Sequence, residues 1–243
     1  SSLGNNNINI RAIAQGASEK NISFVINKKN CYKALNTLHE TFFEENIKEI
    51  NLFIVGVGNV GGKFLEQISK QYKYLIDVLK LRIRVISLSN SKKTCFNNDG
   101  LDLKKWRKLL DSGNNLNLNL LYKNIKKLNL RNSIFVDNTA SEKISDEYEK
   151  YLENNIGVVT CNKIACADRY NKYLNLKKLS RKYGSPFLFE TNVGAGLPII
   201  DTLNNLVDSG DRILKIQAVL SGSLNFIFNN FKKPDTFHKI VLR

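Results

Sequence analysis

Three closely spaced glycines constrain the fold of this chain more than any other feature. Gly56, Gly58 and Gly61 follow the apolar run Asn51–Val55, which is typical of a buried strand, and open the helical pattern Asn59–Asp77. The first glycine permits a tight turn, the second lets a pyrophosphate approach the backbone, and the third lets helix and strand pack closely. Free amides at the start of such a helix bind phosphate. The pattern therefore predicts a dinucleotide site, with a glycine turn that binds nothing as the alternative.

The end of the next predicted strand bears on which dinucleotide binds. Folds that prefer NAD place an acidic residue about 20 residues after the glycines, where it binds the ribose 2′-hydroxyl. Here the strand continues into Ser89-Asn90-Ser91-Lys92-Lys93, and no carboxylate occurs before Asp99. Hydroxyl, amide and ammonium groups suit a 2′-phosphate instead. We therefore expect Ser91 and Lys92 to contact NADP, with NAD as the alternative cofactor.

Strands and helices alternate from residue 50 onward, which indicates an α/β fold. Short apolar runs between amphipathic helices are typical of a sheet covered on both faces, so we expect a Rossmann-type doubly wound parallel sheet. The predicted strands are 8–14, 22–26, 50–55, 81–88, 134–136, 157–160, 187–190 and 213–220, and the predicted helices are 31–43, 59–77, 106–110, 145–154 and 167–183. We interpret the asparagine-rich stretch 114–119 as a surface loop insertion.

Composition excludes several classes of protein. Of the 243 residues, 42% are apolar, which is too many for a disordered chain. A membrane span is not expected, because no run of about 18 apolar residues occurs. The N-terminus does not resemble a signal peptide, and the four cysteines do not suggest a disulfide scaffold. We therefore expect a cytoplasmic protein with no membrane partner.

The net charge of +15 raises nucleic acid as a partner. The basic cluster Lys104–Lys108 contains Trp106, and an aromatic ring among cations can stack on a base. An amphipathic helix with Trp106 turned inward explains the same cluster. The chain also contains 28 Lys and 33 Asn, which is the excess that an AT-rich coding sequence yields. We therefore expect no nucleic-acid partner.

Five blocks of sequence occur in order after residue 50. They are Phe53–Gly62, Val136–Ser141, Val158–Lys163, Phe189–Pro198 and Leu220–Phe226. Their order and spacing resemble the homoserine dehydrogenase family, and Asn7–Val25 resembles the end of the ACT-type regulatory region of bifunctional aspartokinase–homoserine dehydrogenases. The resemblance implies three parts: 1–48, the end of an ACT-like region; 49–184, an NADP-binding Rossmann domain; and 185–243, the start of an α+β substrate-binding and dimerisation domain.

The resemblance implies an enzyme of threonine and methionine biosynthesis. Its reaction is reversible hydride transfer between NADPH and aspartate 4-semialdehyde, which gives L-homoserine. The implied cofactor-binding residues are Gly56, Gly58, Asn59, Val60, Gly61, Ser91, Lys92, Thr139 and Lys163. Lys163 matches the family's functional lysine at the cofactor–substrate junction, where an ammonium polarises the carbonyl oxygen or assists proton transfer. Gly222 and Ser223 match the substrate-side loop, and Ser223 keeps a hydroxyl for a substrate hydrogen bond.

Two further sites are implied by resemblance alone. The set Glu190, Val193, Ala195 and Leu197 matches the family's loop for a monovalent cation, Na⁺ or K⁺, with one carboxylate and three backbone carbonyls as hard oxygen ligands. A glycine-rich turn into the next helix is the simpler explanation of that loop, and both can hold. Gln15 matches an effector contact in threonine-binding ACT loops.

The sequence also departs from the family's pattern. Family members continue with an acidic segment and a helix whose Asp and Lys bind the substrate and supply a proton. This chain ends at His238–Arg243, before those groups, and contains no Met. We therefore expect a fragment of a homo-oligomeric enzyme that binds NADP(H) weakly and reduces the semialdehyde poorly or not at all. A non-catalytic NADP-binding remnant is the alternative.

Overall fold

The computed structural model describes residues 2–16, 21–42, 47–232 and 236–242. It divides into two compact units, Ser1–Leu188 and Phe189–Arg243. The domain boundaries predicted after residues 48 and 184 remain predictions, because compactness alone does not define a domain.

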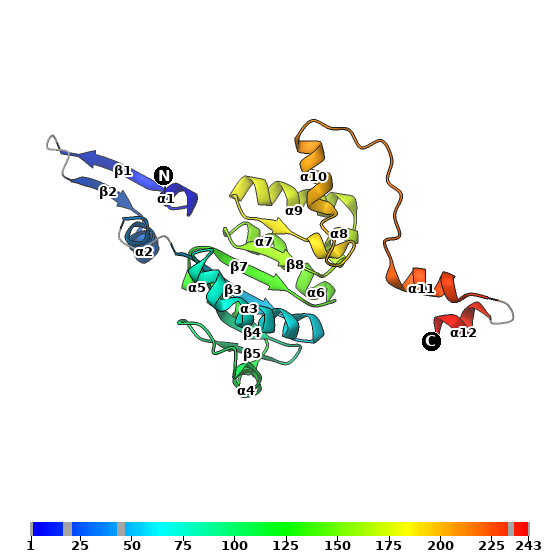
Figure 1. Cartoon of the computed structure of the whole chain (residues 1–243). Helices are drawn as coiled ribbons and strands as arrows, with labels where there is room; N and C mark the ends of the chain where they lie inside the picture. Colours follow the sequence, from blue (N-terminus) through cyan, green and yellow to red (C-terminus); the bar gives the residue numbers. More distant parts are fainter. Residues whose placement is uncertain (1, 17–20, 43–46, 233–235, 243) are drawn as a thin grey trace. The chain divides into compact units, whose positions relative to one another are not determined.

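A seven-stranded sheet forms the centre of the first unit (Figure 1), in the order β6-β5-β4-β3-β7-β8-β9. The strands are β3 (Lys48–Val55), β4 (Leu81–Ser89), β5 (Lys93–Phe96), β6 (Asn114–Asn115), β7 (Ser133–Asp137), β8 (Gly157–Thr160) and β9 (Phe187–Leu188). Parallel pairs join β4, β3, β7, β8 and β9 in that order across the sheet. Antiparallel pairs add β5 and β6 at the β4 edge. The chain runs from β3 to β4 on one side and reaches β7 on the other, so the strand order reverses beside β3. The predicted Rossmann-type fold is confirmed, with two antiparallel edge strands that the pattern did not predict.

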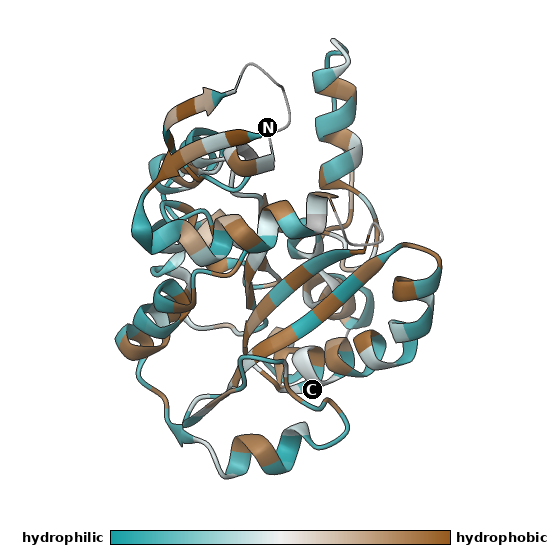
Figure 2. Ribbon diagram, turned by 90° about the vertical axis from the view of Figure 1, so that its left-hand side faces the viewer, coloured by the Kyte–Doolittle hydropathy of each residue, from teal (hydrophilic) through white to brown (hydrophobic). Residues whose placement is uncertain are grey.

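Helices cover both faces of this sheet. Leu52 and Val136 pack in a buried cluster with Leu65 of α3 (Asn59–Asp77). The ring of Phe135 instead stacks on Tyr151 of α7 (Tyr148–Leu152), with 4.0 Å between the ring centroids. Because successive residues of a strand point to opposite faces, α3 and α7 lie on opposite sides of the sheet. Figure 2 shows the apolar residues of the strands in brown between these helical layers.

The glycine turn fixes how closely α3 approaches β3. Gly56 has φ +91°, a conformation that side chains disfavour. A Cβ on Gly61 would lie 1.9 Å from the carbonyl oxygen of Gly56, and a Cβ on Gly56 would lie 2.8 Å from Cγ2 of Thr139. Both positions therefore exclude any side chain, and the start of α3 is held at the carboxyl end of β3.

The remaining helices of the first unit are short or amphipathic. They are α4 (Trp106–Asp111), α5 (Leu118–Leu128), α6 (Glu142–Ser145), α8 (Ile164–Ala167) and α9 (Tyr170–Tyr183). Trp106 packs against the cluster around α3, and the Arg107 guanidinium lies 4.5 Å from the centroid of its ring. This is the arrangement that the amphipathic-helix interpretation of the basic cluster predicts.

The interpretation of residues 114–119 as a loop insertion is wrong. Asn114 and Asn115 form β6, and Asn117 is the N-cap of α5, because its Oδ1 accepts a hydrogen bond from the amide of Leu120 at 3.0 Å. The helix ends at Asn129 in a left-handed conformation with φ 44°. Asparagine is a favoured residue at both ends of a helix, so an asparagine-rich stretch can be a helix boundary.

The N-terminal segment contains the two strands and the helix that its pattern predicts. It contains α1 (Ser2–Asn5), the antiparallel pair β1 (Ile10–Gln15) and β2 (Ile22–Ile26), the 3₁₀ turn η1 (Lys28–Asn30) and α2 (Cys31–Phe42). Leu3, Ile8 and Ala34 form its buried cluster. Residues 17–20 of the ACT-like segment, and Phe43 of the predicted helix, lie outside the described residues.

Residues 189–242 are helical where they are regular and described. The elements are the 3₁₀ turn η2 (Glu190–Asn192), α10 (Ile200–Asp208), α11 (Gly222–Asn230) and α12 (Phe237–Val241). The predicted strand 213–220 is not formed there, and Leu214, Ile216 and Val219 are exposed. Alternating apolar residues make a strand only when a ladder partner is present, and the described residues provide none. Among the helices described, none is both long and apolar enough to cross a bilayer.

The contact between Gly61 and Gly56 predicts a difference between two adjacent glycines of α3. Gly61→Ala should destabilise the fold by about 1–3 kcal/mol, because its Cβ collides with the backbone of the turn. Gly62→Ala is the matched control: its Cβ would lie 4.0 Å from the carbonyl oxygen of Val57, so it should be neutral or stabilising by up to about 1 kcal/mol. Urea unfolding of both variants measures the difference, and equal stabilities would contradict the close approach.

Candidate functional site

Four strands of the sheet end at the same edge. The register pairs Val55 of β3 with both Ser89 of β4 and Asp137 of β7, and it pairs Asp137 with Thr160 of β8. The residue after each of three strands then donates one hydrogen bond to a neighbouring strand. The amide of Gly56 donates to the Ser89 carbonyl at 2.9 Å, that of Asn138 to Val55 at 2.8 Å, and that of Cys161 to Asp137 at 3.1 Å. The segments that follow the strands are therefore held together at the carboxyl edge, beside the point where the strand order reverses.

The start of α3 lies open at this edge. Gly58 is the N-cap, no side chain caps the helix, and no described atom lies within 4 Å of the position of a Cβ on Gly58. Asn59 and Val60 are exposed in the first turn. Unpaired amides and the helix dipole attract phosphate at such an end. The five residues 56, 58, 59, 60 and 61 predicted to bind a pyrophosphate are thus in one place, with space in front of Gly58.

A buried amide group lies beside the glycine turn. Asn138 Nδ2 has no hydrogen-bond partner among the described residues, and it lies 3.4 Å from the position of a Cβ on Gly61. Cys161 Sγ donates to Asn138 Oδ1 at 3.9 Å. A buried donor without a partner is costly, and an acceptor supplied by a ligand relieves that cost. This observation and the open helix end fit a phosphorylated ligand.

Ser91 and Lys92 lie in a tight turn directly after β4. Asn90 Oδ1 accepts from the amides of Lys92 at 2.8 Å and Lys93 at 2.7 Å. Ser91 and Lys92 are exposed, whereas Lys93 is half-buried and its ammonium donates to the Gly113 carbonyl at 3.1 Å. Of the two lysines, Lys92 therefore has the freer ammonium. Because Ser89 pairs with Val55, this turn lies next to the glycine turn, as a 2′-phosphate site requires.

A buried polar network lies under Thr139. Asp137 is fully buried, and its carboxylate accepts hydrogen bonds from the Thr139 amide at 2.7 Å, the Tyr148 hydroxyl at 2.6 Å and Asn162 Nδ2 at 3.0 Å. Thr160 Oγ1 lies 2.8 Å from the Tyr148 hydroxyl. None of the motifs in the sequence predicts this network. Its detectable signal is an aspartate at a strand end two residues before a threonine, the spacing of an Asx-turn.

Lys163 is an exposed residue that precedes α8 as its N-cap. The neighbouring Asn162 is buried. Its backbone amide donates to Thr160 Oγ1 at 2.8 Å, and its Oδ1 accepts from the Ile164 amide at 3.1 Å. The position of Lys163 is therefore set by buried groups while its ammonium faces solvent. Lys163 and Thr139 follow neighbouring strands, so the structure brings these two predicted residues to the same edge.

The remaining predicted residues follow β9, start α11 or end β1. Both oxygens of Glu190 accept hydrogen bonds from the start of α10, from the amide of Ile200 at 2.9 Å and the amide of Asp201 at 2.8 Å. Gly222 and Ser223 are exposed in the first turn of α11. Gln15 is exposed at the end of β1, where it pairs with Ile22.

The turn before α10 holds the rest of the predicted cation set. Ala195 has φ 53°, and a Cβ on Gly194 would lie 2.2 Å from Ile199 Cδ1. The Leu197 carbonyl already accepts from the Ile199 amide at 2.9 Å. A tight turn into a helix therefore accounts for the glycines. The oxygens of Glu190, Val193, Ala195 and Leu197 still form a donor set of the kind that hard cations prefer, so the predicted cation site stays a prediction.

Burial governs the titration of the two nearest acidic groups. Burial, and then the charge of Asp137, raises the pKa of Tyr148 far above its usual value. The same two causes raise the pKa of Cys161, although backbone hydrogen bonding and Lys163 oppose them. Both groups are therefore neutral near pH 7. Cys161 is a partly buried thiol rather than a thiolate nucleophile.

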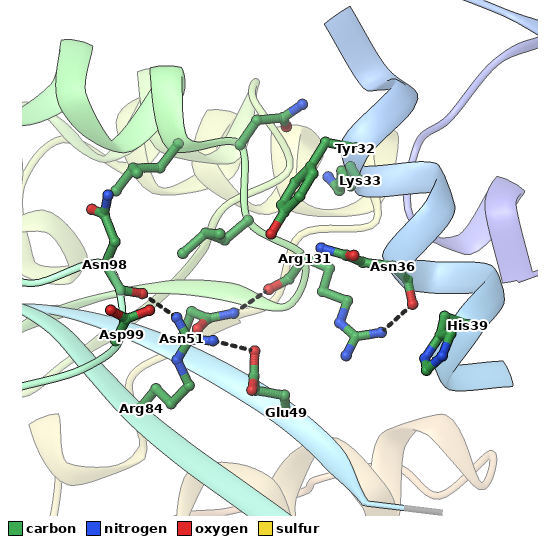
Figure 3. A pocket seen from close by; sticks show the side chains of 13 residues that line it. Tyr32, Lys33, Asn36, His39, Glu49, Asn51, Arg84, Asn98, Asp99 and Arg131 are labelled. Carbon is green, nitrogen blue, oxygen red and sulfur yellow. Dashed lines mark hydrogen bonds and ion pairs between the residues drawn. The ribbon is translucent and has the colours of Figure 1, made fainter. Parts of the chain in front are cut away.

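A cavity of about 500 Å³ lies at the opposite edge of the sheet, where β3 and β4 begin (Figure 3). It contains the ion pair between Glu49 and Arg84, at 2.9 Å, and Arg131, whose guanidinium donates to the Asn36 carbonyl at 3.1 Å. Burial lowers the pKa of Lys33 on its wall. None of the site residues predicted from the sequence lines this cavity. The residues predicted to bind the cofactor lie at the carboxyl edge instead.

Family profiles and curated proteins match nearly the whole length of this chain. The sequence profile of the homoserine dehydrogenase NAD-binding domain matches residues 56–190, that of homoserine dehydrogenase matches 198–243, and that of an ACT domain matches 1–42. The bifunctional aspartokinase/homoserine dehydrogenase of Buchnera aphidicola is 42% identical over 232 residues, which are 95% of this chain and 28% of that protein. A chloroplastic bifunctional enzyme of Arabidopsis thaliana is 38% identical over 98% of this chain and 26% of its own length.

Solved structures show the same fold. A hyperthermophilic archaeal homoserine dehydrogenase in complex with NADPH is 27% identical, with a TM-score of 0.67, over 80% of this chain and 60% of that chain. The present chain spans only about a quarter of the curated relatives reported above.

The raised pKa of Tyr148 predicts a loss of stability in alkali. Above about pH 10 the unfolded chain releases the Tyr148 proton and the folded chain keeps it, so unfolding becomes easier as the pH rises. Tyr148→Phe removes this contribution. The free energy of unfolding should therefore fall less in Tyr148→Phe than in the unaltered chain between about pH 9 and about pH 11. An equal fall in both proteins would contradict the buried position of the hydroxyl.

Proposed function

Because the chain belongs to the homoserine dehydrogenase family, we propose that it takes part in reversible hydride transfer between NADPH and aspartate 4-semialdehyde, which gives L-homoserine. The observation that supports this most directly is the open start of α3 between the ends of β3, β4 and β7. A helix end of this kind binds the pyrophosphate of a dinucleotide at the reversal of strand order. The experiment that tests it is an assay of the protein with both substrates.

NADP is the cofactor that the edge fits best. The turn after β4 offers the Ser91 hydroxyl and the Lys92 ammonium, both exposed, and has no carboxylate that would bind a ribose 2′-hydroxyl. A 2′-phosphate gains charge-assisted hydrogen bonds from such groups. The archaeal neighbour with the same fold is described with NADPH. The family profile specifies an NAD-binding domain, so the choice of NADP over NAD is part of the proposal.

Lys163 and Thr139 are the residues nearest to the chemistry in this proposal. Bound NADPH supplies the hydride. The Lys163 ammonium, exposed at the edge, polarises the carbonyl oxygen of the semialdehyde and stabilises the negative charge that develops on it. Thr139 lies against the glycine turn, where the middle of an extended dinucleotide crosses the edge. Gly222 and Ser223 contribute substrate contacts through backbone and hydroxyl.

A monovalent cation is a second proposed ligand. Glu190 would supply a carboxylate oxygen, and Val193, Ala195 and Leu197 would supply backbone carbonyls. Oxygen donors suit Na⁺ and K⁺, and a cation there would also offset the negative charge of the Glu190 carboxylate, which accepts hydrogen bonds from two amides of α10. Its part would be to order the turn before α10.

The full protein would have wider roles. The bifunctional aspartokinase/homoserine dehydrogenases match 95% and 98% of this chain, and an ACT-domain profile matches residues 1–42, which supports an effector role for Gln15 in a regulatory region. We propose small molecules as its ligands and a homo-oligomer as its assembly. The four free cysteines support a reducing compartment such as the cytoplasm.

The cofactor preference gives a prediction with a matched control. Lys92→Ala should weaken NADPH binding about 10- to 100-fold and leave NADH binding unchanged, because only NADPH has the phosphate that Lys92 contacts. Lys93→Ala should have a smaller effect, since the Lys93 ammonium donates to Gly113. Fluorescence titration with both cofactors measures the affinities. Tighter binding of NADH than NADPH, or equal effects of the two variants, would contradict this assignment.

The role of Lys163 gives a prediction about turnover. Lys163→Met should lower kcat by about 10²- to 10⁴-fold with little change in NADPH affinity. Lys172→Met is the control: the Lys172 ammonium pairs with Asp146 at 2.6 Å and Asp168 at 2.8 Å and has no role assigned in the reaction, so its loss should leave kcat nearly unchanged. Oxidation of NADPH by the semialdehyde is the readout. Cofactor binding without turnover in the unaltered protein would favour the non-catalytic remnant instead.

A further inference from the structure

A carboxylate is buried beneath the candidate site without a cationic partner. Asp137 is 0% exposed, and no ion pair of the described residues includes it. Three neutral donors contact it instead, from three different segments: the amide of Thr139, the hydroxyl of Tyr148 and the side-chain amide of Asn162. A buried carboxylate is costly unless hydrogen bonds replace its water, and here every contact comes from a segment at or below the edge.

Two of these donors connect Asp137 to the residues assigned to the reaction. Through its amide, Thr139 is held at 2.7 Å from Asp137 Oδ1, and its own Oγ1 accepts from the Ser141 amide at 3.1 Å. Asn162 Nδ2 donates both to Asp137 and to the Ser141 carbonyl, each at 3.0 Å. Asp137 therefore joins the segment after β7 to the segment after β8.

Asn162 transmits this constraint to Lys163. Its Oδ1 accepts from the Ile164 amide, so the Asn162 side chain spans the backbone of Lys163 and fixes the start of α8. The orientation of the Asn162 side chain is in turn set by Asp137. Removal of the carboxylate would take one acceptor from Asn162 Nδ2 and the acceptor of the Thr139 amide, and so loosen the two backbone segments that carry Thr139 and Lys163.

Tyr148 ties the network to the core. Its hydroxyl donates to Asp137 Oδ2 at 2.6 Å, and its ring packs between Phe135 and Phe187, with 6.4 Å and 6.1 Å between ring centroids. Tyr151 lies on the same helix and is equally buried, but its ring stacks on Phe135, and no hydrogen bond among the described residues joins its hydroxyl to Asp137. The two tyrosines of α7 therefore differ in their contact with the carboxylate.

The adenosine half and the nicotinamide half of a bound dinucleotide would meet different residues. Ser91 and Lys92 after β4 face the adenosine ribose, and the start of α3 faces the pyrophosphate. The nicotinamide half must then extend to the other side of β3, toward β7 and β8. The hydrogen bonds of the Asp137 carboxylate at this edge hold the segments after β7 and β8, which lie on that side.

We propose that Asp137 is a positioning residue for the nicotinamide half of the cofactor, which acts by fixing the backbone of Thr139 and Lys163. This inference rests on the proposed function, because it takes the dinucleotide to lie along the carboxyl edge. Asp137 touches neither cofactor nor substrate in this account. Its carboxylate is needed because an amide in its place has one acceptor oxygen and cannot accept from all three donors.

Calorimetric titration with NADPH and with adenosine 2′,5′-bisphosphate separates positioning from general stability. Adenosine 2′,5′-bisphosphate contains the half of the cofactor that contacts β4 and α3, and it lacks the nicotinamide half. Asp137→Asn should weaken NADPH binding by about tenfold or more and change binding of the bisphosphate by less than about twofold. A purely structural loss would weaken both ligands together.

Tyr148→Phe and Tyr151→Phe are the second variant and its control. Tyr148→Phe removes one donor to the carboxylate and keeps the ring, so it tests the network even if Asp137→Asn does not fold. It should weaken NADPH binding by about threefold or more without affecting the bisphosphate, whereas Tyr151→Phe should affect neither ligand.

The outcomes distinguish failure of the positioning role of Asp137 from failure of the proposed function. If the unaltered chain binds the bisphosphate and NADPH, and the variants at 137 and 148 keep the same ratio of the two affinities, the positioning role is wrong and the proposed function stands. If the variants lose both ligands in parallel, the network is structural only and the positioning role is again wrong. If the unaltered chain binds neither ligand, the proposed function fails and this inference fails with it.

Discussion

The close contact between Gly61 and Gly56 is the constraint on which the rest of the site depends. A helix that crosses a strand with 1.9 Å between the position of a Cβ and a carbonyl oxygen tolerates only glycine. This approach brings the first turn of α3 to the carboxyl edge and leaves Gly58 open in front of it. The turns after β4, β7 and β8 then surround that helix end, because their strands are in register with β3 or with β7. If α3 moved away from β3, the helix dipole would no longer point at the space between those turns.

Charge is less informative about this protein than its net value of +15 suggests. The basic cluster around Trp106 is part of an amphipathic helix, with Trp106 packed on the core. Two specific uses of positive charge are proposed: the Lys92 ammonium after β4 contacts the 2′-phosphate, and the Lys163 ammonium polarises the carbonyl oxygen of the substrate. The other charged group of interest is negative and buried. Asp137 has no cation beside it in the described chain, and its neutral donors hold the two segments that carry Thr139 and Lys163.

Periodicity and the glycine spacing were sufficient to predict the sheet strands β3, β4, β7 and β8 and the helix α3. These elements are long or strongly apolar, and their pattern depends on local residues. The edge strands β5 and β6 were not predicted, because strands of four and two residues have too few positions to show an alternation. The strand predicted at 213–220 failed for the opposite reason: its alternation is clear, but pairing needs a partner that the local sequence cannot reveal.

The candidate site divides in the same way. The residues of the glycine turn, Ser91, Lys92, Thr139 and Lys163 were predicted from motifs, and the structure places them at one edge. The roles of Asp137, Tyr148 and Asn162 could not be predicted, because they depend on three segments that meet only in the fold. Lys92 and Lys93 are adjacent in the sequence and have the same ammonium group. The hydrogen bond of the Lys93 ammonium to the Gly113 carbonyl distinguishes them in the structure.

A crystal structure of the chain with NADPH would test the central claim most directly, since it locates every part of the cofactor at once. We expect the pyrophosphate at the start of α3 in front of Gly58, the 2′-phosphate at Ser91 and Lys92, and the nicotinamide beside Thr139 and Lys163. Density for the cofactor at the opposite edge of the sheet, in the cavity beside Glu49 and Arg84, would contradict it.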